Sequence, residues 1–580
     1  MTPARFLAIV DFSGPEGAIP LKRRIAGRGK LAPVFDSAPL TILAAPGTRI
    51  LRAGDRGLIV GDLFGAASFA RVDTRCGDAI ANRDPIPTDR YWGDYVALTA
   101  RPDNRSATIV RSPSGGVHAF RVRAGPLVCV ASHIEDLIDA GLATPTIDWA
   151  FTAHHLAFSH LHTGTTGLAG VDEILPGECA IERDGRCERS TLWSPWMFTT
   201  GERRAPGFDE AAARVREAVL RATAALVPPG ETVALELSGG LDSSIVAAAL
   251  AAAGARTVAL NLATPGAEGD ERRYARAVSE HMKIPLIKTR VEGDIDLTEV
   301  APHLEARPAM LAMLRLADRA FAERGRDHRI GAFVNGTGGD CVFCSLGTAA
   351  PAVDRLRVRG MTAGLAATIG DIAAVHGDNV WTAARMAFRL HRRGPPVPIW
   401  RRNRKFLNND RLPDAPAPHP WLDEPPGALP GTRAHIHAIL ASYAHLDGYG
   451  RHMVAPSLFP LLSQPVVEAC LSVPTWLWVA GGRDRAVARE AFRGALPRTI
   501  VERRTKGRMD AFCARTFERN RARLRPFLLD GQLAAAGLLD RTAIEAYLAQ
   551  PFANRDQLFY ALLPIADTEA WARRVAAPSP

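Results

Sequence analysis

The residues in this sequence best suited to chemistry form a short loop rich in glycine and serine. An apolar run at 232–237 (TVALEL), expected to be a strand, leads directly into Ser238–Ser244 (SGGLDSS), and a helix is expected over 243–253. Glycines let a backbone approach an anion closely, serines offer hydroxyl groups, and the start of a helix offers free N–H groups. The pattern therefore predicts a cradle for phosphate groups.

One residue of this loop has the wrong charge for a bare anion site. Asp242 would repel a phosphate, but it fits the loop if a magnesium ion bridges its carboxylate to the phosphates. The loop is not a Walker loop, because GxxxxGK[ST] does not occur in the chain. A turn without any ligand is the alternative, and the complete heptapeptide between a strand and a helix disfavours it.

A second glycine-rich motif ends in another carboxylate. The apolar run 332–335 (AFVN) predicts a short strand, and Gly336–Asp340 (GTGGD) follows it. Alone, this motif would indicate only a turn. Beside Ser238–Ser244 it indicates a second part of the same site, since two carboxylates around one hard cation suit magnesium.

These residues resemble known motifs. The heptapeptide resembles the pyrophosphate loop of the ATP-pyrophosphatase superfamily, and GTGGD is similar to a motif of the asparagine synthetase family. The resemblance implies that ATP is cleaved between its α- and β-phosphates, that a substrate oxygen is adenylated, and that a nucleophile displaces AMP. It also implies that Asp340 and Asp242 share Mg2+, so ATP and Mg2+ are the expected cofactors. The residues expected to bind ATP or its pyrophosphate are Ser238, Gly239, Gly240, Leu241, Asp242, Ser243, Ser244, Leu260 and Gly336.

A third stretch, near the C-terminus, is similar to the tail of the same family. Arg485–Phe492 (RAVAREAF) and Arg503–Gly507 (RRTKG) follow the order of the family's K-x-x-L-R-x-A and R-x-K, with arginine in place of the first lysine. By this match Lys506 faces the reacting carbonyl, where a lysine can neutralise the α-phosphate and a developing oxyanion. Lys506 and Thr337 are the expected catalytic residues; a surface lysine is the alternative for Lys506. Acids at 268–271 are expected near the nucleotide or, alternatively, at a solvated helix start.

Composition and length bound the class of protein. The chain has 580 residues, 47% of them hydrophobic and 23% charged, a formal net charge of +10 and eight scattered cysteines. This length exceeds one hydrophobic core and indicates two or more domains. The positive charge suits an anionic partner or a solvated arginine-rich surface. No apolar run reaches membrane-spanning length, so we expect a cytoplasmic protein without membrane or nucleic-acid partners.

Two regions with different patterns predict an α/β protein of two domains. Residues 1–200 read as short strands separated by turn residues, as in β-rich folds, and 193–208 has the Pro and Gly content of a linker. Residues 205–580 begin with alternating strands and helices, which indicates a parallel sheet, and continue with many helices. The strands expected in the first region are 6–10, 95–99, 107–110, 117–122 and 127–131.

The first region is similar to the glutaminase-like (Ntn-type) domain of asparagine synthetases. The similar motifs, in the same order, are Gly93-Asp94-Tyr95, Val110-Arg111-Ser112, Ala131-Ser132 and Leu175-Pro176-Gly177. That domain requires a cysteine directly after the initiator methionine, whereas Thr2 and Pro3 stand here and the first cysteine is Cys76. Threonine can act as a nucleophile, but Pro3 and the missing glutamine-binding pattern favour a β-rich sandwich that lacks its nucleophile and remains as a scaffold.

Departures from the asparagine synthetase pattern indicate a branch of the family. Those enzymes carry Glu where Thr337 and Cys341 stand, and no tyrosine could be matched to the one that β-lactam synthetases use. The chain is similar to lasso-peptide cyclases, which adenylate an Asp or Glu side chain of a precursor peptide for attack by the peptide's own N-terminal amine, giving a macrolactam. A precursor peptide and a leader-peptide protease are then the expected partners. The alternatives are a small-molecule amide synthetase using ammonia or a free amine, and a non-catalytic paralogue that binds ATP or a partner.

Two further sets of residues are weaker signals for a metal. Cys341 and Cys344 form one CxxC pair, which supplies too few ligands for a structural zinc site. The other set lies in the first region without a supporting acid and consists of His154, His155, His160 and His162. Neither set predicts a zinc site.

Overall fold

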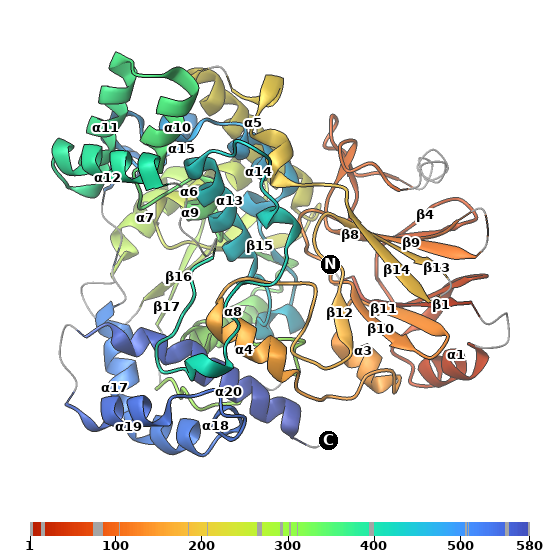
Figure 1. Cartoon of the computed structure of the whole chain (residues 1–580). Coiled ribbons are helices and arrows are strands. Elements are labelled where there is room, and N and C mark those ends of the chain that lie inside the picture. The colour runs from red at the N-terminus through yellow and green to blue at the C-terminus, as the bar shows by residue number, and fades with distance from the viewer. Residues whose placement is uncertain are drawn as a thin grey trace.

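The computed structural model shows a β-rich N-terminal part and a C-terminal part in which helices surround a parallel sheet (Figure 1). This is the predicted two-part α/β organisation. The domain limits 1–200 and 205–580 stay a prediction. The structure describes residues 4–577 apart from 13–17, 74–84, 102, 104, 184, 206, 264–269, 291–293, 301–302, 310, 394–399, 505–506, 508–509 and 552–555.

The N-terminal part contains two antiparallel six-stranded sheets, in the orders β12-β10-β11-β1-β3-β2 and β14-β13-β9-β8-β5-β4. Side chains alternate along β1: Phe6, Ala8 and Val10 join the core between the sheets, while Leu7 and Ile9 pack toward the helices outside. The strands are β1 (Phe6–Asp11), β2 (Ala32–Ser37), β3 (Leu40–Ala44), β4 (Ile50–Arg52), β5 (Gly57–Gly61), β6 (Phe64–Gly65), β7 (Tyr91–Trp92), β8 (Tyr95–Ala100), β9 (Ser106–Arg111), β10 (Phe120–Ala124), β11 (Leu127–Ala131), β12 (Val171–Glu173), β13 (Glu178–Arg183) and β14 (Arg186–Thr191). The helices are α1 (Ile19–Ala26), α3 (Ile134–Asp139) and α4 (Trp149–Ala157).

Four of the five strands predicted in this part are present as β1, β8, β9 and β11. The fifth, predicted at 117–122, begins only at Phe120. The Arg111 side chain explains the late start, because its Nε donates to the Val117 carbonyl oxygen (2.8 Å) and its Nη2 to that of Gly115 (2.9 Å). These bonds hold the segment before β10 as a loop.

The C-terminal part is built on a five-stranded parallel sheet in the order β17-β16-β15-β18-β19. On β15, Val233 and Leu235 pack with α5 and α6 in one core, and Ala234 faces the other side with Phe321 of α8. The strands are β15 (Thr232–Glu236), β16 (Arg256–Ala263), β17 (Leu286–Arg290), β18 (Ala332–Val334) and β19 (Ser457–Leu458). The helices are α5 (Phe208–Leu226), α6 (Leu241–Ala252), α7 (Arg272–Met282), α8 (Arg315–Asp327), α9 (Gly339–Val342), α10 (Ala350–Arg359), α11 (Ala363–His376), α12 (Val380–Arg393), α13 (Pro430–Tyr443), α14 (Gln464–Leu471), α15 (Ala486–Ala491), α16 (Arg498–Val501), α17 (Asp510–Leu529), α18 (Gln532–Ala535), α19 (Arg541–Ala549) and α20 (Leu563–Ala576).

The strand order reverses between β15 and β18. Chain order runs outward from β15 through β16 to β17 on one side, and through β18 to β19 on the other. In open parallel sheets, ligands bind outside the carboxyl ends of the strands at such a reversal. Both glycine-rich motifs stand here, because Ser238–Ser244 follows β15 and Gly336–Asp340 follows β18.

Buried polar contacts join the two parts. Trp193 Nε1 donates to a carboxylate oxygen of Glu468 (2.7 Å), and the Gln464 backbone N–H donates to Ser114 Oγ (3.1 Å). Trp196, in the predicted linker 193–208, donates its indole N–H to the carbonyl oxygen of Trp421 (2.9 Å). Because buried polar groups are costly to leave unpaired, these bonds favour one arrangement of the two parts.

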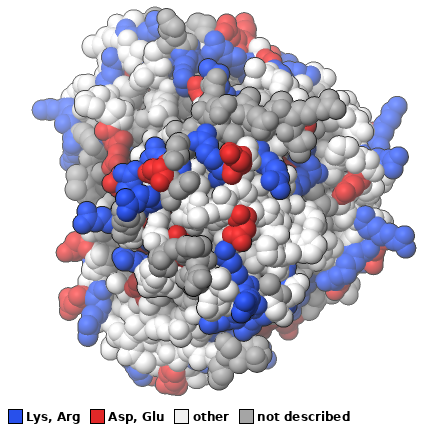
Figure 2. Space-filling view, turned by 90° about the vertical axis from the view of Figure 1, so that its right-hand side faces the viewer, with Lys and Arg blue, Asp and Glu red and all other residues white. Residues whose placement is uncertain are grey.

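Figure 2 shows the molecule from the side of the N-terminal part. Figure 2 shows basic and acidic side chains interspersed over a largely uncharged face. Among the helices of the described residues, none is both long and apolar enough to cross a bilayer.

Candidate active site

A cavity of about 610 Å³ lies at the carboxyl ends of β15 and β18. The predicted site residues that line it are Ser238, Gly240, Leu241, Asp242, Ser243, Leu260, Gly336, Thr337 and Asp340. Gly239 and Ser244 belong to the same loop but lie behind its surface, and the Ser244 hydroxyl donates to the Gly240 carbonyl oxygen (2.7 Å). Lys506 lies outside the described residues, so its role stays a prediction. The structure therefore brings the two glycine-rich motifs together.

Hydrogen bonds within the loop set its shape. The Gly240 N–H donates to Ser238 Oγ (3.2 Å), and the hydroxyls of Ser238 and Ser243 are 3.1 Å apart. Gly239 has φ +81°, and a Cβ there would lie 2.5 Å from the backbone nitrogen of Ala275. Only glycine fits this position without strain. Helix α6 starts at Leu241, within Ser238–Ser244, so its N-terminus stands at the cavity wall, where unpaired N–H groups can bind an anion.

Arg485 holds the two predicted magnesium ligands together. Its Nη1 donates to both carboxylate oxygens of Asp242 (3.1 Å each) and to a carboxylate oxygen of Asp340. Burial alone would lower the pKa of Arg485, but Asp242, Asp340 and Asp484 outweigh burial and raise that pKa above its ordinary range. Two carboxylates that reach one nitrogen are also close enough to bind one metal cation. The guanidinium thus stands where a divalent cation would neutralise the same two groups.

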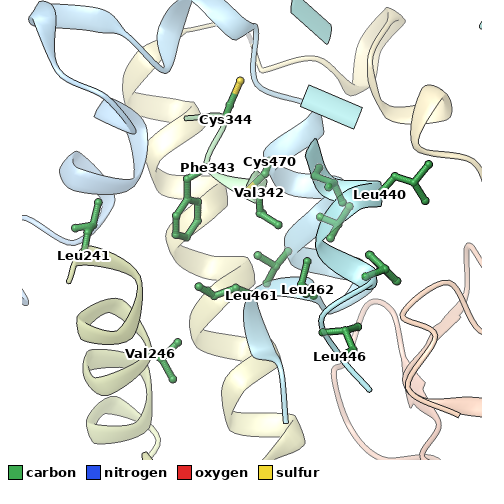
Figure 3. Close-up of a cluster of buried hydrophobic side chains, with 14 of the residues drawn as sticks. Leu241, Val246, Val342, Phe343, Cys344, Leu440, Leu446, Leu461, Leu462 and Cys470 are labelled. Carbon is green, nitrogen blue, oxygen red and sulfur yellow. The ribbon is translucent and has the colours of Figure 1, made fainter. Parts of the chain in front are cut away.

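Glycines and a buried core bring the second carboxylate to the first. A Cβ on Gly339 would lie 2.5 Å from both Cβ and Cγ of Asp242, so no larger residue fits between the motifs. Apolar side chains fix α6 against α9 and the segment before α14. Figure 3 shows several of these buried side chains, among them Leu241, Val246, Val342, Phe343, Leu461 and Leu462.

A polar cluster that no motif indicated lies at the cavity wall, which two of its members, Glu236 and Asn335, line. Glu236 accepts hydrogen bonds from Asn335 Nδ2 (3.2 Å) and from Arg451, which also pairs with Asp318 (3.1 Å). Burial raises the pKa of Glu236, against the opposing effects of Arg451 and Asn335. Two signals could have indicated the cluster: a glutamate inside the apolar run TVALEL and an asparagine at the end of AFVN.

Arg503 connects the C-terminal motif Arg503–Gly507, called the third motif below, to the loop Ser238–Ser244. Its Nη1 donates to the carbonyl oxygen of Gly239 (3.0 Å), and its guanidinium pairs with Glu271. Glu271 also accepts the backbone N–H of Gly507 (2.9 Å). Of the acidic stretch 268–271, Glu271 therefore positions the third motif, while residues 268–269 lie outside the described part of the chain.

The rest of the cavity wall comes from elements that no motif indicated. Leu314 directly precedes α8 and Phe321 lies in its middle, and His445 and Tyr449 follow α13. His160 comes from the N-terminal part, directly after the α4 region. The N-terminal part, predicted to remain as a scaffold, therefore also supplies part of the cavity wall.

Comparison with known proteins places the chain in a family. The asparagine synthase family profile matches residues 211–573. The chain belongs to the asparagine synthase family. A curated relative is carboxyethyl-arginine β-lactam synthase of Streptomyces clavuligerus, which is 35% identical over 120 residues. That match spans 20% of this chain and only 22% of the relative's length.

Two solved structures show a weak likeness. One is the structure of the allosteric regulatory enzyme of purine biosynthesis, with a TM-score of 0.21, 11% identity, and coverage of 56% of this chain and 82% of that one. The other is glutamine phosphoribosylpyrophosphate amidotransferase from B. subtilis complexed with ADP and GMP, with a TM-score of 0.20, 12% identity, and coverage of 58% and 77%. These scores are too low to carry an argument.

The left-handed glycine of the loop gives a direct test of its geometry. We expect Gly239→Ala to lower the free energy of unfolding by about 1–3 kcal/mol, because the new Cβ meets the α7 backbone and the residue keeps a strained φ. Gly494→Ala is the matched control, since nothing lies within 4 Å of its added Cβ. Urea unfolding followed by tryptophan fluorescence measures both. A Gly239→Ala midpoint equal to that of the control would contradict the geometry.

Proposed function

We propose that this protein is an ATP-dependent ligase that adenylates a carboxylate and forms an amide bond, releasing AMP and pyrophosphate. The observation that carries the proposal is the convergence of Asp242 and Asp340 on one cation position beside Ser238–Ser244 at a helix start. Membership of the asparagine synthase family supports it, as does the match to an enzyme named for a β-lactam, which is a cyclic amide.

The residues present fit a magnesium ion beside ATP. Asp242 and Asp340 offer the carboxylate oxygens that Mg2+ prefers, and Arg485 marks a position from which one cation reaches both. When bound, the ion supplies charge neutralisation for the pyrophosphate leaving group. The hydroxyls of Ser238 and Ser243, with the first N–H groups of α6, bind phosphate oxygens. Arg485 then exchanges carboxylate oxygens for phosphate oxygens as its partners.

The reaction has two steps. A carboxylate oxygen of the substrate attacks the α-phosphorus, and the bond to pyrophosphate breaks. An amine then attacks the acyl carbon; the C–N bond forms, the C–O bond to AMP breaks, and the nitrogen loses one proton. Lys506 stabilises the negative charge that develops at the carbonyl oxygen. Thr337, which lines the same cavity, offers a hydroxyl to the substrate.

We infer further that the carboxylate is an Asp or Glu side chain of a precursor peptide and that the amine is the peptide's own N-terminus, giving the macrolactam of a lasso peptide. The similarity of GTGGD to lasso-peptide cyclases supports this inference, and so do Thr337 and Cys341 where asparagine synthetases carry Glu. Holding the amine beside the acyl-adenylate makes ring closure effectively unimolecular, which is worth several kcal/mol of barrier, about 7–11 at best.

A small-molecule amide synthetase is the second candidate, favoured by the β-lactam synthase match. It differs in using ammonia or a free amine and in needing no peptide. A non-catalytic paralogue is the third candidate, and the intact Ser238–Ser244 and Asp340 count against it.

The decisive incubation combines the enzyme, ATP, Mg2+ and candidate precursor peptides with and without a leader. We expect pyrophosphate release together with loss of one water from the core peptide, measured by mass spectrometry. Asp242→Ala and Lys506→Ala should each abolish the water loss, because the first removes a proposed ligand of the magnesium ion and the second removes a cation at the reacting carbonyl. Lys405→Ala, at an exposed lysine outside the cavity lining, is the control. Pyrophosphate release with free aspartate and ammonia, but not with peptide, would overturn the peptide assignment and favour the second candidate.

We also propose that a leader-peptide protease docks on the exposed face of α10–α12. Six of the eleven exposed large hydrophobic side chains among the described residues belong to this segment: Val358, Met361, Val380, Trp381, Met386 and Phe388. Exposed apolar clusters of this kind mark protein–protein contact sites. Helix α11 also packs against the 480–482 turn, where the Ala374 side chain lies close to Gly482. A partner bound here would therefore lie near the chain segment that carries Arg485.

Truncating the aromatic side chains of this face tests the partner. We expect Trp381→Ala with Phe388→Ala to weaken binding of the protease at least tenfold, because exposed aromatics are common anchors of interfaces, and to leave pyrophosphate release with a leaderless peptide unchanged. Met197→Ala, at an exposed methionine of the N-terminal part, is the control. Equal affinities of the wild type, the double variant and the control for the protease, measured by calorimetry, would contradict the docking site.

A further inference from the structure

Two histidines from different parts of the chain meet in the cavity wall. His445 follows α13 and His160 follows α4, and both line the cavity with their ring centroids 4.9 Å apart. His160 has φ +64°, which is uncommon for a residue other than glycine and is kept only where the surroundings impose it. Contacts between the two parts of the protein therefore hold one imidazole against the other.

The other histidines of the same sequence stretch have structural partners, and the His155 ring stacks on that of Phe151. His154 Nε2 accepts the backbone N–H of Ala417 (2.8 Å), and His162 lies 3.2 Å from a guanidinium nitrogen of Arg307. In the described part of the chain, His, Cys, Asp and Glu side chains form no group of three that could hold a metal ion.

Amide formation requires a group that accepts one proton from the attacking nitrogen. Among the described lining residues, Glu236 is engaged by Arg451 and Asn335. The Tyr449 hydroxyl donates to the His445 carbonyl oxygen (2.9 Å), and burial raises the pKa of Tyr449 to about 12.

The remaining lining groups are no better suited. The carboxylates of Asp242 and Asp340 pair with Arg485, guanidinium groups can only donate, and the thiol of Cys341 would itself first have to lose a proton. Among the described lining residues, this leaves the two imidazoles as the neutral groups suited to accept a proton.

Their surroundings keep both rings neutral at pH 7. Burial, reinforced by His160, lowers the pKa of His445 to about 4, and burial also lowers the pKa of His160. The titratable neighbours of the pair include His155, whose pKa is lowered by burial and by His160, and Tyr449, whose hydroxyl donates to the His445 carbonyl oxygen. A neutral imidazole has one nitrogen free to accept a proton. Once an amine has attacked the acyl carbon, its nitrogen is cationic and strongly acidic, so even a weak base can take its proton.

We propose that His445 accepts the proton released by the attacking amine, and that His160 is the positioning residue that orients it and passes the proton to solvent. The proposal rests on the proposed ligase function and assigns the site of its amine step. The proton leaves nitrogen for the His445 ring as the C–N bond forms, and AMP departs with the C–O electron pair. His160 is the more solvent-accessible of the two histidines although its ring is partly covered, which gives the proton a route to water. The N-terminal part then contributes to the amine step through the His160 side chain.

The two half-reactions separate this role from a structural one. We expect His445→Gln to keep peptide-dependent pyrophosphate release, because the acyl-adenylate still forms. When hydroxylamine is added, the activated peptide should be captured as a hydroxamate, because this nucleophile needs little help from a base. Macrolactam formation should fall at least about 100-fold, the usual contribution of a positioned base. His328→Gln, at an exposed histidine outside the cavity, is the matched control and should match the wild type.

The pH profile tests His160. In the wild type, the rate of macrolactam formation should rise as the peptide amine loses its proton, at about pH 8. The loss of rate caused by protonation of His445 should be confined to acid pH. Removing His160 removes the neighbour that lowers the pKa of His445. In His160→Gln the acid-side loss should therefore move to higher pH. A merely structural role of His160 would lower the rate without moving the pH at which the acid-side loss of rate occurs.

Each outcome decides the matter. His445→Gln forming macrolactam at the wild-type rate would overturn the proposal, and so would loss of pyrophosphate release or hydroxamate in that variant, because either loss would assign His445 to adenylation. An unmoved acid limb in His160→Gln would overturn the role of that residue. A wild-type enzyme that neither releases pyrophosphate nor closes a ring with any peptide would instead overturn the proposed function itself.

Discussion

The site depends on holding two carboxylates together where a triphosphate must also bind. Two unit charges 4 Å apart interact by about 1 kcal/mol in water and about 4 kcal/mol at an effective dielectric constant of 20, so Asp242 and Asp340 would move apart without a cation. Arg485 supplies that cation in the structure by donating to both. The same arrangement is what a magnesium ion requires. The rest of the C-terminal part can be understood as the means of fixing these two side chains.

Sheet order and packing both serve this purpose. The two aspartates follow neighbouring parallel strands at the point where the strand order reverses, so their loops meet outside the same sheet edge. Glycine at position 339 removes the side chain that would separate them, and the core around Leu241 and Phe343 fixes the helices behind them. The N-terminal part completes the wall through His160, and buried bonds such as that of Trp193 to Glu468 hold it in place.

The sequence revealed the features that are local in the chain. Ser238–Ser244 and Gly336–Asp340 each carry their chemistry in a few consecutive residues between a strand and a helix, so residue type and order indicated the phosphate cradle and the second carboxylate. Most strand positions were also predictable, because apolar runs end at Gly, Pro or Asp. The predicted start of β10 was wrong because it is set by Arg111, whose bonds to the loop no local pattern records.

Long-range contacts could not be predicted in the same way. Arg485 and Asp242 are separated by 243 positions in the chain, and nothing in the RAVAREAF stretch shows that its arginine reaches that carboxylate. His160 and His445 belong to different parts and meet only because the two parts pack together. The histidine-rich stretch was visible in the sequence, but which of its members faces the cavity depends on the fold. The roles of Lys506 and Thr337 stay predictions from resemblance.

Isotope transfer tests the central claim most directly, that the carboxylate is activated as an adenylate. A precursor peptide carrying oxygen-18 in its acceptor side-chain carboxylate would be processed with ATP, and the nucleotide and phosphate products analysed by mass spectrometry. Attack of the carboxylate on the α-phosphorus predicts one labelled oxygen in AMP for each ring closed and none in pyrophosphate. Label in inorganic phosphate, with ADP as the nucleotide product, would show attack on the γ-phosphorus and contradict the account.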